Sequence, residues 1–252
     1  QMRAIGSQAA HLSETLQKDV QAVSDKLDEI STTVFDAMDS LENRDLVTDG
    51  SQTDPDSITM GALRGCENTG AVQADRNVGG IAGAVGMEAG ADPESDVSQS
   101  LSTTECKQYE LRAVLQRCVS TGAVTAKKDC AAAICGRMDL GLIDGCEAYG
   151  SVESQSGDYA GGVAGICSAA IENCWAKCAL SGGRYVGGIT GTGVTDSVTG
   201  SGSTVSGCVS LVSITGYSQY AGAISGSSAG AFADNLFVSD TLAGLDGASA
   251  AG

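Results

Sequence analysis

The 252-residue sequence has few aromatic residues, almost no proline and a single histidine. Phe, Trp and Tyr together make up 4% of the chain, and there are 2 prolines. A core with so few large rings must be filled by small side chains, which suits thin stacked layers better than one thick globular core. We interpret the histidine, His11, as a solvated helix residue rather than a metal ligand or a general base.

Basic residues are also scarce, because 14 Lys and Arg stand against 31 Asp and Glu, for a formal net charge of −17. Nucleic acids and anionic membranes both attract basic surfaces, so the charge argues against either as a partner. No stretch approaches the ~18–20 apolar residues of a membrane span, and no signal peptide is visible. The abrupt start at Gln1 leads us to expect a piece excised from a longer protein.

Glycine, in contrast, is abundant, with 35 residues, and apolar residues still make up 42% of the chain. The glycine share is roughly twice the usual ~7%. The chain can therefore bury a core, and its glycines are expected to serve turns and close packing rather than disorder.

Residues 16–41 carry an apolar seam with alternating spacings of three and four residues. Its members are Leu16, Val20, Val23, Leu27, Ile30, Val34, Ala37 and Leu41. This heptad spacing predicts a coiled-coil helix within an N-terminal region at 1–46. The mixture of β-branched residues and leucine at both seam positions leaves dimers and trimers open. We expect the seam to pack on a second copy or a partner helix, or alternatively on the rest of the same chain.

Residues 47–64 form an acidic segment that we interpret as a linker. Asp54 and Asp56 alternate there as the ligands of a calcium loop do. The glycine and the distal bidentate glutamate of such a loop are missing at the required offsets, so this calcium pattern is incomplete. No other metal site, no cofactor and no catalytic residue is predicted.

From residue 65 onward the chain repeats itself about every 28 residues, and this repeat decides the predicted fold. Each unit begins with a cysteine, and an apolar residue follows six positions later. The leading residues are Cys66, Cys118, Cys146, Cys174 and Cys208. The apolar residues are Val72, Val124, Val152, Leu180 and Ile214. A last step of about 28 residues leads us to expect Leu236 in the cysteine position of a final, incomplete unit. The longer first interval indicates an insertion or a degenerate unit at 87–117.

A glycine-rich block closes most units, as Val-Gly-Gly-Ile-Ala-Gly at 78–83, Ala-Gly-Gly-Val-Ala-Gly at 160–165 and Val-Gly-Gly-Ile-Thr-Gly at 186–191. Even offsets from each cysteine lie on one face of a strand, so the cysteine and apolar columns should both point into a narrow core. The paired glycines mark a bend or a close backbone approach. The predicted fold class is mainly β, a β-helix or β-solenoid of about 28-residue coils at 65–252, of either hand, behind the N-terminal helix.

The unit from Gly65 to Val72, Gly-Cys-Glu-Asn-Thr-Gly-Ala-Val, together with the block at 78–83, resembles the GLUG motif. The characteristic ending appears here as Gly-Ile-Ala-Gly and Gly-Val-Ala-Gly. The resemblance covers about residues 65–244, with departures at 87–117, in the last unit and at 130–136, where one extra residue is expected. It implies a β-helical array of the kind found in secreted and surface proteins of bacteria, with the look of Gram-positive gut anaerobes. Such arrays also precede the catalytic domain of immunoglobulin-A-cleaving metallopeptidases, and the family has no established activity of its own.

Ten cysteines in an extracellular chain usually indicate disulfides, but half of them here occupy one repeated position. Free cysteine is a small and well-buried apolar residue, so a column of thiols fits a narrow core. Thiols and disulfides are both left open. The pair Cys174 and Cys178 lacks the further ligands that a zinc site needs.

The favoured function is a non-catalytic surface or secreted module, such as a stalk, an adhesin segment or a display segment with a protein or glycan ligand. The alternative is an accessory domain of a secreted hydrolase. A polysaccharide-acting β-helix enzyme is the third interpretation, for which the candidate bases are Arg76, Arg112, Lys127, Lys128, Arg137 and Arg184. We see no repeated offset that would join these bases to carboxylates, and a negatively charged chain suits a polyanionic substrate poorly.

Overall fold

The computed structural model describes residues 47–86, 109–196, 200, 202–227, 229–238 and 242–245, together with seven positions between Gln17 and Lys26. Those seven positions are helical, and Val20 and Val23 are 62% and 60% exposed. The rest of the predicted coiled-coil helix, with His11, lies outside the described residues. The chain divides into two compact units, 1–46 and 47–252. Among the described residues, no helix is both long and apolar enough to cross a membrane.

The second unit is mainly β, as predicted, and every pair of its named strands runs parallel. The first sheet contains β2 (Ala62–Arg64), β8 (Val114–Gln116), β13 (Leu142–Asp144), β17 (Ala170–Glu172), β21 (Thr204–Ser206) and β25 (Ala231–Ala233). The second contains β3 (Glu67–Asn68), β4 (Val72–Ala74), β9 (Val119–Ser120), β10 (Val124–Ala126), β14 (Glu147–Ser154), β18 (Trp175–Ser181), β22 (Val209–Ser210), β23 (Ser213–Gly216) and β26 (Leu236–Phe237).

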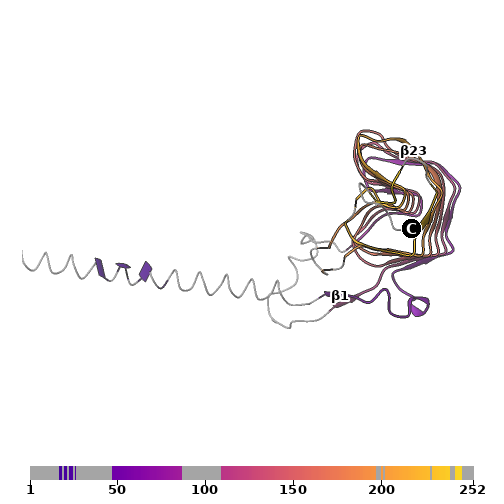
Figure 1. Ribbon diagram of the computed structural model, residues 1–252. Helices are drawn as coiled ribbons and strands as arrows, with labels where there is room; N and C mark the ends of the chain where they lie inside the picture. Colours follow the sequence, from indigo (N-terminus) through magenta and orange to yellow (C-terminus); the bar gives the residue numbers. More distant parts are fainter. Residues whose placement is uncertain are drawn as a thin grey trace, which may run out of the picture. The chain divides into compact units, whose positions relative to one another are not determined.

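Two smaller sheets continue the same path of the chain. The third sheet contains β5 (Val78–Gly79), β11 (Ala131–Ala132), β15 (Ala160–Gly161), β19 (Arg184–Gly187) and β24 (Gln219–Gly222). The fourth contains β6 (Ala82–Val85), β12 (Cys135–Met138), β16 (Ala164–Cys167) and β20 (Thr190–Gly193). We call one passage through these sheets a layer, and Figure 1 shows the strands of successive layers lying side by side. The six layers begin at β2, β8, β13, β17, β21 and β25.

Equivalent residues of successive layers stack directly on one another. Val124 pairs with Val72 on one side and with Val152 on the other, and Leu180 and Ile214 continue the same column. Val124, Val152 and Leu180 are 1%, 1% and 0% exposed, whereas Val72 and Ile214 are half-buried near the ends of the stack. The core is therefore a column of aliphatic side chains that is closed in the middle layers.

Each layer also turns a corner immediately before its leading residue, where the backbone has a positive φ. This left-handed conformation occurs at Gly65, Arg117, Gly145, Asn173, Gly207 and Asp234. Glycine adopts it without steric cost, and asparagine and aspartate tolerate it better than other residues, which accounts for five of the six. A second left-handed corner lies at the start of the third sheet, at Asn77, Cys130, Tyr159, Tyr185 and Tyr220.

The leading cysteines lie just inside the first corner and link the layers through their thiols. The backbone N–H of Cys118 donates to Sγ of Cys146, that of Cys146 to Sγ of Cys174, and that of Cys174 to Sγ of Cys208, each over 3.4 Å. These four cysteines are 0% exposed, and Cys66, in the first layer, is half-buried. The nine described cysteines are free thiols, and Cys106 lies outside the described residues.

The structure places four segments differently from the expectations drawn from the sequence. Asn235, not Leu236, follows the sixth corner, and its Oδ1 accepts the N–H of Cys208 over 3.0 Å. An amide oxygen thus replaces the thiol, after an interval one residue shorter than the usual step. The block at 130–136 has no extra residue, because Ala131 pairs with Val78 and Cys135 with Ala82.

The predicted linker at 47–64 and the segment at 87–117, predicted to be an insertion or a degenerate unit, both contribute strands. Segment 47–64 holds β1 (Val47–Asp49), the 3₁₀ helix η1 (Pro55–Ser57) and β2, and β2 is the first strand of the first sheet. Segment 87–117 ends with β7 (Tyr109–Leu111), which pairs with β1, and with β8, which is a regular strand of the second layer. Residues 87–108 lie outside the described residues.

Leu180→Asp should lower the free energy of unfolding by more than about 3 kcal/mol, because it places an unpaired charge in the closed part of the core. Ala179→Asp is the matched control, since Ala179 is exposed on the same strand. Chemical denaturation of both variants measures the difference. Equal stability of the two variants would contradict this register.

Cys146→Ala should cost about 1–3 kcal/mol more than Cys178→Ala, because only the first change leaves a buried backbone N–H, that of Cys118, without its acceptor. Cys178 is also buried, at 6% exposed. Urea denaturation of the two variants tests this, and an equal loss would show that the thiol column acts by packing alone.

Candidate functional site

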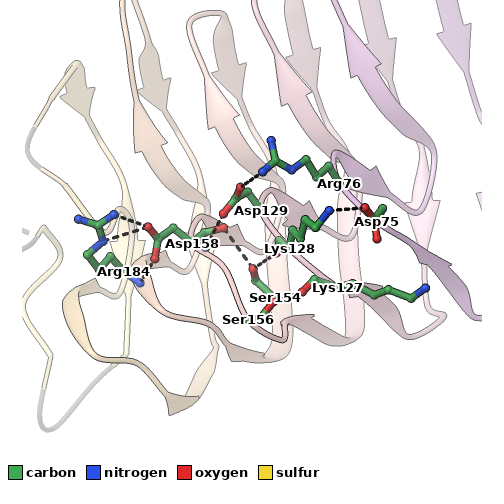
Figure 2. A network of polar contacts seen from close by, with 9 residues as sticks. All are labelled: Asp75, Arg76, Lys127, Lys128, Asp129, Ser154, Ser156, Asp158 and Arg184. Atoms are coloured by element: carbon green, nitrogen blue, oxygen red, sulfur yellow. Dashed lines mark hydrogen bonds and ion pairs between the residues drawn. The ribbon is translucent and has the colours of Figure 1, made fainter.

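Polar side chains of the first four layers gather where the chain passes from the second sheet to the third. We call this surface the corner ridge, and Figure 2 shows it. It contains Asp75, Arg76, Lys127, Lys128, Asp129, Ser154, Ser156, Asp158 and Arg184. The ridge directly precedes the second left-handed corner, so each layer delivers its polar residues to the same place.

Two aspartates on the ridge bind the backbone of the next layer. Oδ1 of Asp129 accepts the N–H of Asp158 over 3.0 Å, and Oδ1 of Asp158 accepts the N–H of Arg184 over 2.8 Å. The approach is close, because a side chain at Gly157 or Gly183 would collide with these carboxylates. Each aspartate therefore caps the tight turn of the layer above it.

The remaining carboxylate oxygens of these aspartates pair with arginines. Oδ2 of Asp158 accepts Nε and Nη2 of Arg184 over 2.9 and 2.7 Å, and Arg76 lies 3.5 Å from Oδ2 of Asp129. Burial raises the pKa of Asp158, but the hydrogen bonds and charge of Arg184 outweigh it and hold that pKa below its ordinary value. The carboxylate of Asp158 is therefore kept ionised.

The ridge also contains an exposed ion pair and two serines that bind the backbone, of which Ser156 is exposed and Ser154 is buried. Nζ of Lys128 lies 2.8 Å from Oδ2 of Asp75, and this contact lowers the pKa of Asp75. The hydroxyl of Ser154 donates to the carbonyl of Lys128, and that of Ser156 to the carbonyl of Lys127.

A groove of about 450 Å³ lies alongside the ridge, across the third, fourth and fifth layers. Its walls are the turns at 153–157, 181–183 and 216–218. Serine and glycine dominate the lining, Glu153 is its one charged residue, and Tyr217 is 51% exposed. The groove is therefore polar and nearly uncharged.

Three tyrosines stack at the corner next to this groove. The rings of Tyr159 and Tyr185 lie 5.3 Å apart, and those of Tyr185 and Tyr220 lie 4.8 Å apart, with interplanar angles of 10° and 19°. These spacings match the separation of neighbouring strands, so the register of the layers produces the stack.

The residues singled out from the sequence separate into distinct groups in the structure. Asp56 lies 2.9 Å from Nη2 of Arg117, and Asp54 is the left-handed residue that begins η1. Among the described residues, no cluster of three His, Cys, Asp or Glu side chains is arranged to hold a metal. Of the six candidate bases, five form ion pairs with carboxylates. The five are Arg76, Arg112, Lys128, Arg137 and Arg184.

Sequence reasoning missed the two capping aspartates and the tyrosine stack. A signal for both was present, because Asp129 and Asp158 each stand one residue before the second corner, and the tyrosines stand at it. When the repeat units are aligned on their glycine blocks, the aspartates fall at one shared position and the tyrosines at the next.

No family model, no curated protein and no solved structure matches the chain.

Asp158→Asn should lower the free energy of unfolding at neutral pH by about 1–2 kcal/mol, because it weakens charge-assisted bonds to a side chain that is 18% exposed. The folded-state pKa of Asp158 is depressed, so its stabilisation is present at neutral pH and is lost as the pH falls below about 4. Thermal unfolding at a series of pH values measures this.

The difference between wild type and Asp158→Asn should therefore shrink in acid. Asp75→Asn is the control, because the pair with Lys128 is exposed and screened by solvent, and no change in stability is expected. If the difference in stability between wild type and Asp158→Asn stays constant even at pH values below the pKa of carboxylates, the ion pair between Asp158 and Arg184 is contradicted.

Proposed function

We propose that the chain is a non-catalytic structural and interaction module of a secreted or surface-displayed bacterial protein, built as a GLUG-type β-solenoid. The solenoid is supported by the parallel, in-register sheets and by the repeat of one layer about every 28 residues. The GLUG assignment rests on the resemblance of the repeated unit, and the extracellular location rests on that resemblance in turn.

The non-catalytic part of the proposal rests on one observation, which is that both carboxylate oxygens of Asp158 already accept hydrogen bonds. Its two oxygens accept three bonds from Arg184, and its pKa is displaced away from neutrality. A general acid or base works best with a pKa near the operating pH and a lone pair or proton free to reach the substrate. The groups on the ridge that resemble catalytic residues thus hold the turns of the layers together.

The groove beside the ridge is the surface that we assign to a ligand. The hydroxyl groups of Ser181 and Ser218 and the half-buried glycine backbone offer donors and acceptors with almost no net charge, and Tyr217 offers a ring with a polar end. A chain with a net charge of −17 repels polyanions. A neutral glycan that runs across the layers fits these properties best.

The seam at 16–41 supplies the second element of the proposal. We assign it to self-association or to a partner helix, because eight apolar side chains at heptad spacing would otherwise form a long exposed stripe. Val20 and Val23, the two seam residues that the structure describes, are exposed, so this part of the stripe is available to a partner. Such a helix would hold several copies of the module together for display.

Electrophoresis of the full chain through gels that contain soluble neutral polysaccharides tests the ligand assignment. We expect at least one of them to retard the protein, and we expect Tyr217→Ala to abolish the retardation. Val194→Ala is the control, because Val194 is an exposed apolar residue outside the groove.

Release of reducing ends from the same polysaccharides tests the absence of catalysis, and we expect none. Cleavage that Asp158→Asn removes without unfolding the protein would overturn the non-catalytic assignment. Retardation that survives Tyr217→Ala, or that no polysaccharide produces, would reject the groove as the glycan site.

A further inference from the structure

The outer face of the second sheet becomes apolar in its last three layers. Trp175 is 50% exposed, Leu211 40%, Leu236 63% and Val238 70%, and Val209 between them is half-buried. We call these five residues the apolar face. Trp175 is the only tryptophan of the chain, and exposed aromatic and aliphatic side chains gathered in this way mark an interaction surface.

The register arranges this surface into two columns. Trp175 pairs with Val209, and Val209 with Leu236, so these three form the first column. Lys177, Leu211 and Val238 lie two residues further along the chain and form the second, since alternate residues share one face. Leu211 and Val238 directly follow β22 and β26, and their backbone N–H groups continue the ladder by donating to the carbonyls of Ala176 and Ser210. The residues between the columns, Ala176 and Ser210, point inward and are 1% exposed.

The preceding layer extends both columns with polar residues. Glu147 pairs with Trp175 in the first column, and Tyr149 pairs with Lys177 in the second. The hydroxyl of Tyr149 donates to Oε2 of Glu147 over 2.7 Å across the two columns.

We propose that this face binds the same face of a second copy of the chain, about a two-fold axis that runs along the stacking direction between the two columns. Such an axis exchanges the columns within each layer. Trp175 then faces Lys177 of the second copy, Val209 faces Leu211, Leu236 faces Val238, and Glu147 faces Tyr149.

This exchange is self-complementary in chemistry as well as in shape. A lysine over a tryptophan ring makes a cation–π contact, two layers pair aliphatic with aliphatic side chains, and a carboxylate meets a phenol. The identical strand spacing of the two copies lets the faces pack as two sheets about 10 Å apart. A two-fold axis parallel to the strands would instead keep the columns and reverse the order of the layers, which places Lys177 against Val238 and leaves its charge unpaired. The interface shares no residue with the groove or with the seam at 16–41.

The single tryptophan makes the proposal directly measurable in the full chain. We expect sedimentation equilibrium to show a monomer–dimer equilibrium and the tryptophan emission to shift to shorter wavelength as the dimer forms. Salt should strengthen the dimer, since each copy carries a net charge of −17.

Leu211→Glu should weaken the dimer by at least about tenfold, because it places a charge opposite Val209 of the second copy. Val238→Glu is a second variant at a more exposed position. Ala84→Glu, exposed on the fourth sheet, is the control and should behave as wild type. Circular dichroism establishes that each variant is folded.

The double variant Val20→Asp, Val23→Asp distinguishes association through the apolar face from association through the seam at 16–41. Dimerisation and the emission shift should both survive it. If this variant is monomeric, or if the emission of the wild type does not respond to concentration, the proposal is overturned and association belongs to the helix. A wild type that is monomeric throughout overturns it as well.

Oxidative cross-linking tests the axis. A mixture of Val209→Cys and Leu211→Cys chains should give a disulfide-linked dimer, because these two positions face each other only between copies. Either variant alone should give no more cross-linked product than the unsubstituted chain. Efficient cross-linking of Val209→Cys with itself would indicate the other two-fold axis and reject the proposed pairing.

Discussion

The backbone hydrogen bonds between layers fix each residue about 4.8 Å from its equivalent in the next layer, and the rest of the structure depends on this spacing. A side chain inside the stack must fit under a copy of itself, which favours small and aliphatic residues. The cysteine column satisfies a further need at the corner, where the leading N–H bonds a sulfur atom of the next layer in place of a carbonyl. Asn235 shows that the requirement is for an acceptor rather than for sulfur, since its amide oxygen closes the column.

The same spacing puts like side chains next to each other on the surface, where charges would repel. Asp129 and Asp158 occupy neighbouring layers on the corner ridge, and each is neutralised by an arginine and by a backbone N–H. Tyrosines at equivalent positions benefit instead, because rings at strand spacing stack. The exposed residues thus divide into those that reinforce the layers and those that remain available to partners.

The available surfaces lie on different parts of the stack and differ in chemistry. The groove is hydroxyl-rich and nearly uncharged, whereas the apolar face of the second sheet carries the tryptophan and four aliphatic side chains. Both cross several layers, so neither is formed within a single repeat unit. In the proposed function this separation allows one surface to hold a glycan while the other and the helical seam hold copies of the chain together.

The sequence by itself determined the mainly β class and the two columns of Cys118 and Val124, because a constant period gives residues at equal offsets equal places in successive layers. It could not determine the partner of Cys208, since the turns vary in length and the last step is 27 residues rather than 28. Nor did it reveal that β2 lies within the predicted linker and β8 within the segment predicted to be an insertion or a degenerate unit, where no glycine block marks them. The ridge, the groove and the apolar face were decided only by the tertiary structure. Their residues are separated by whole layers along the chain, and they meet because parallel pairing brings those layers within one strand spacing of each other.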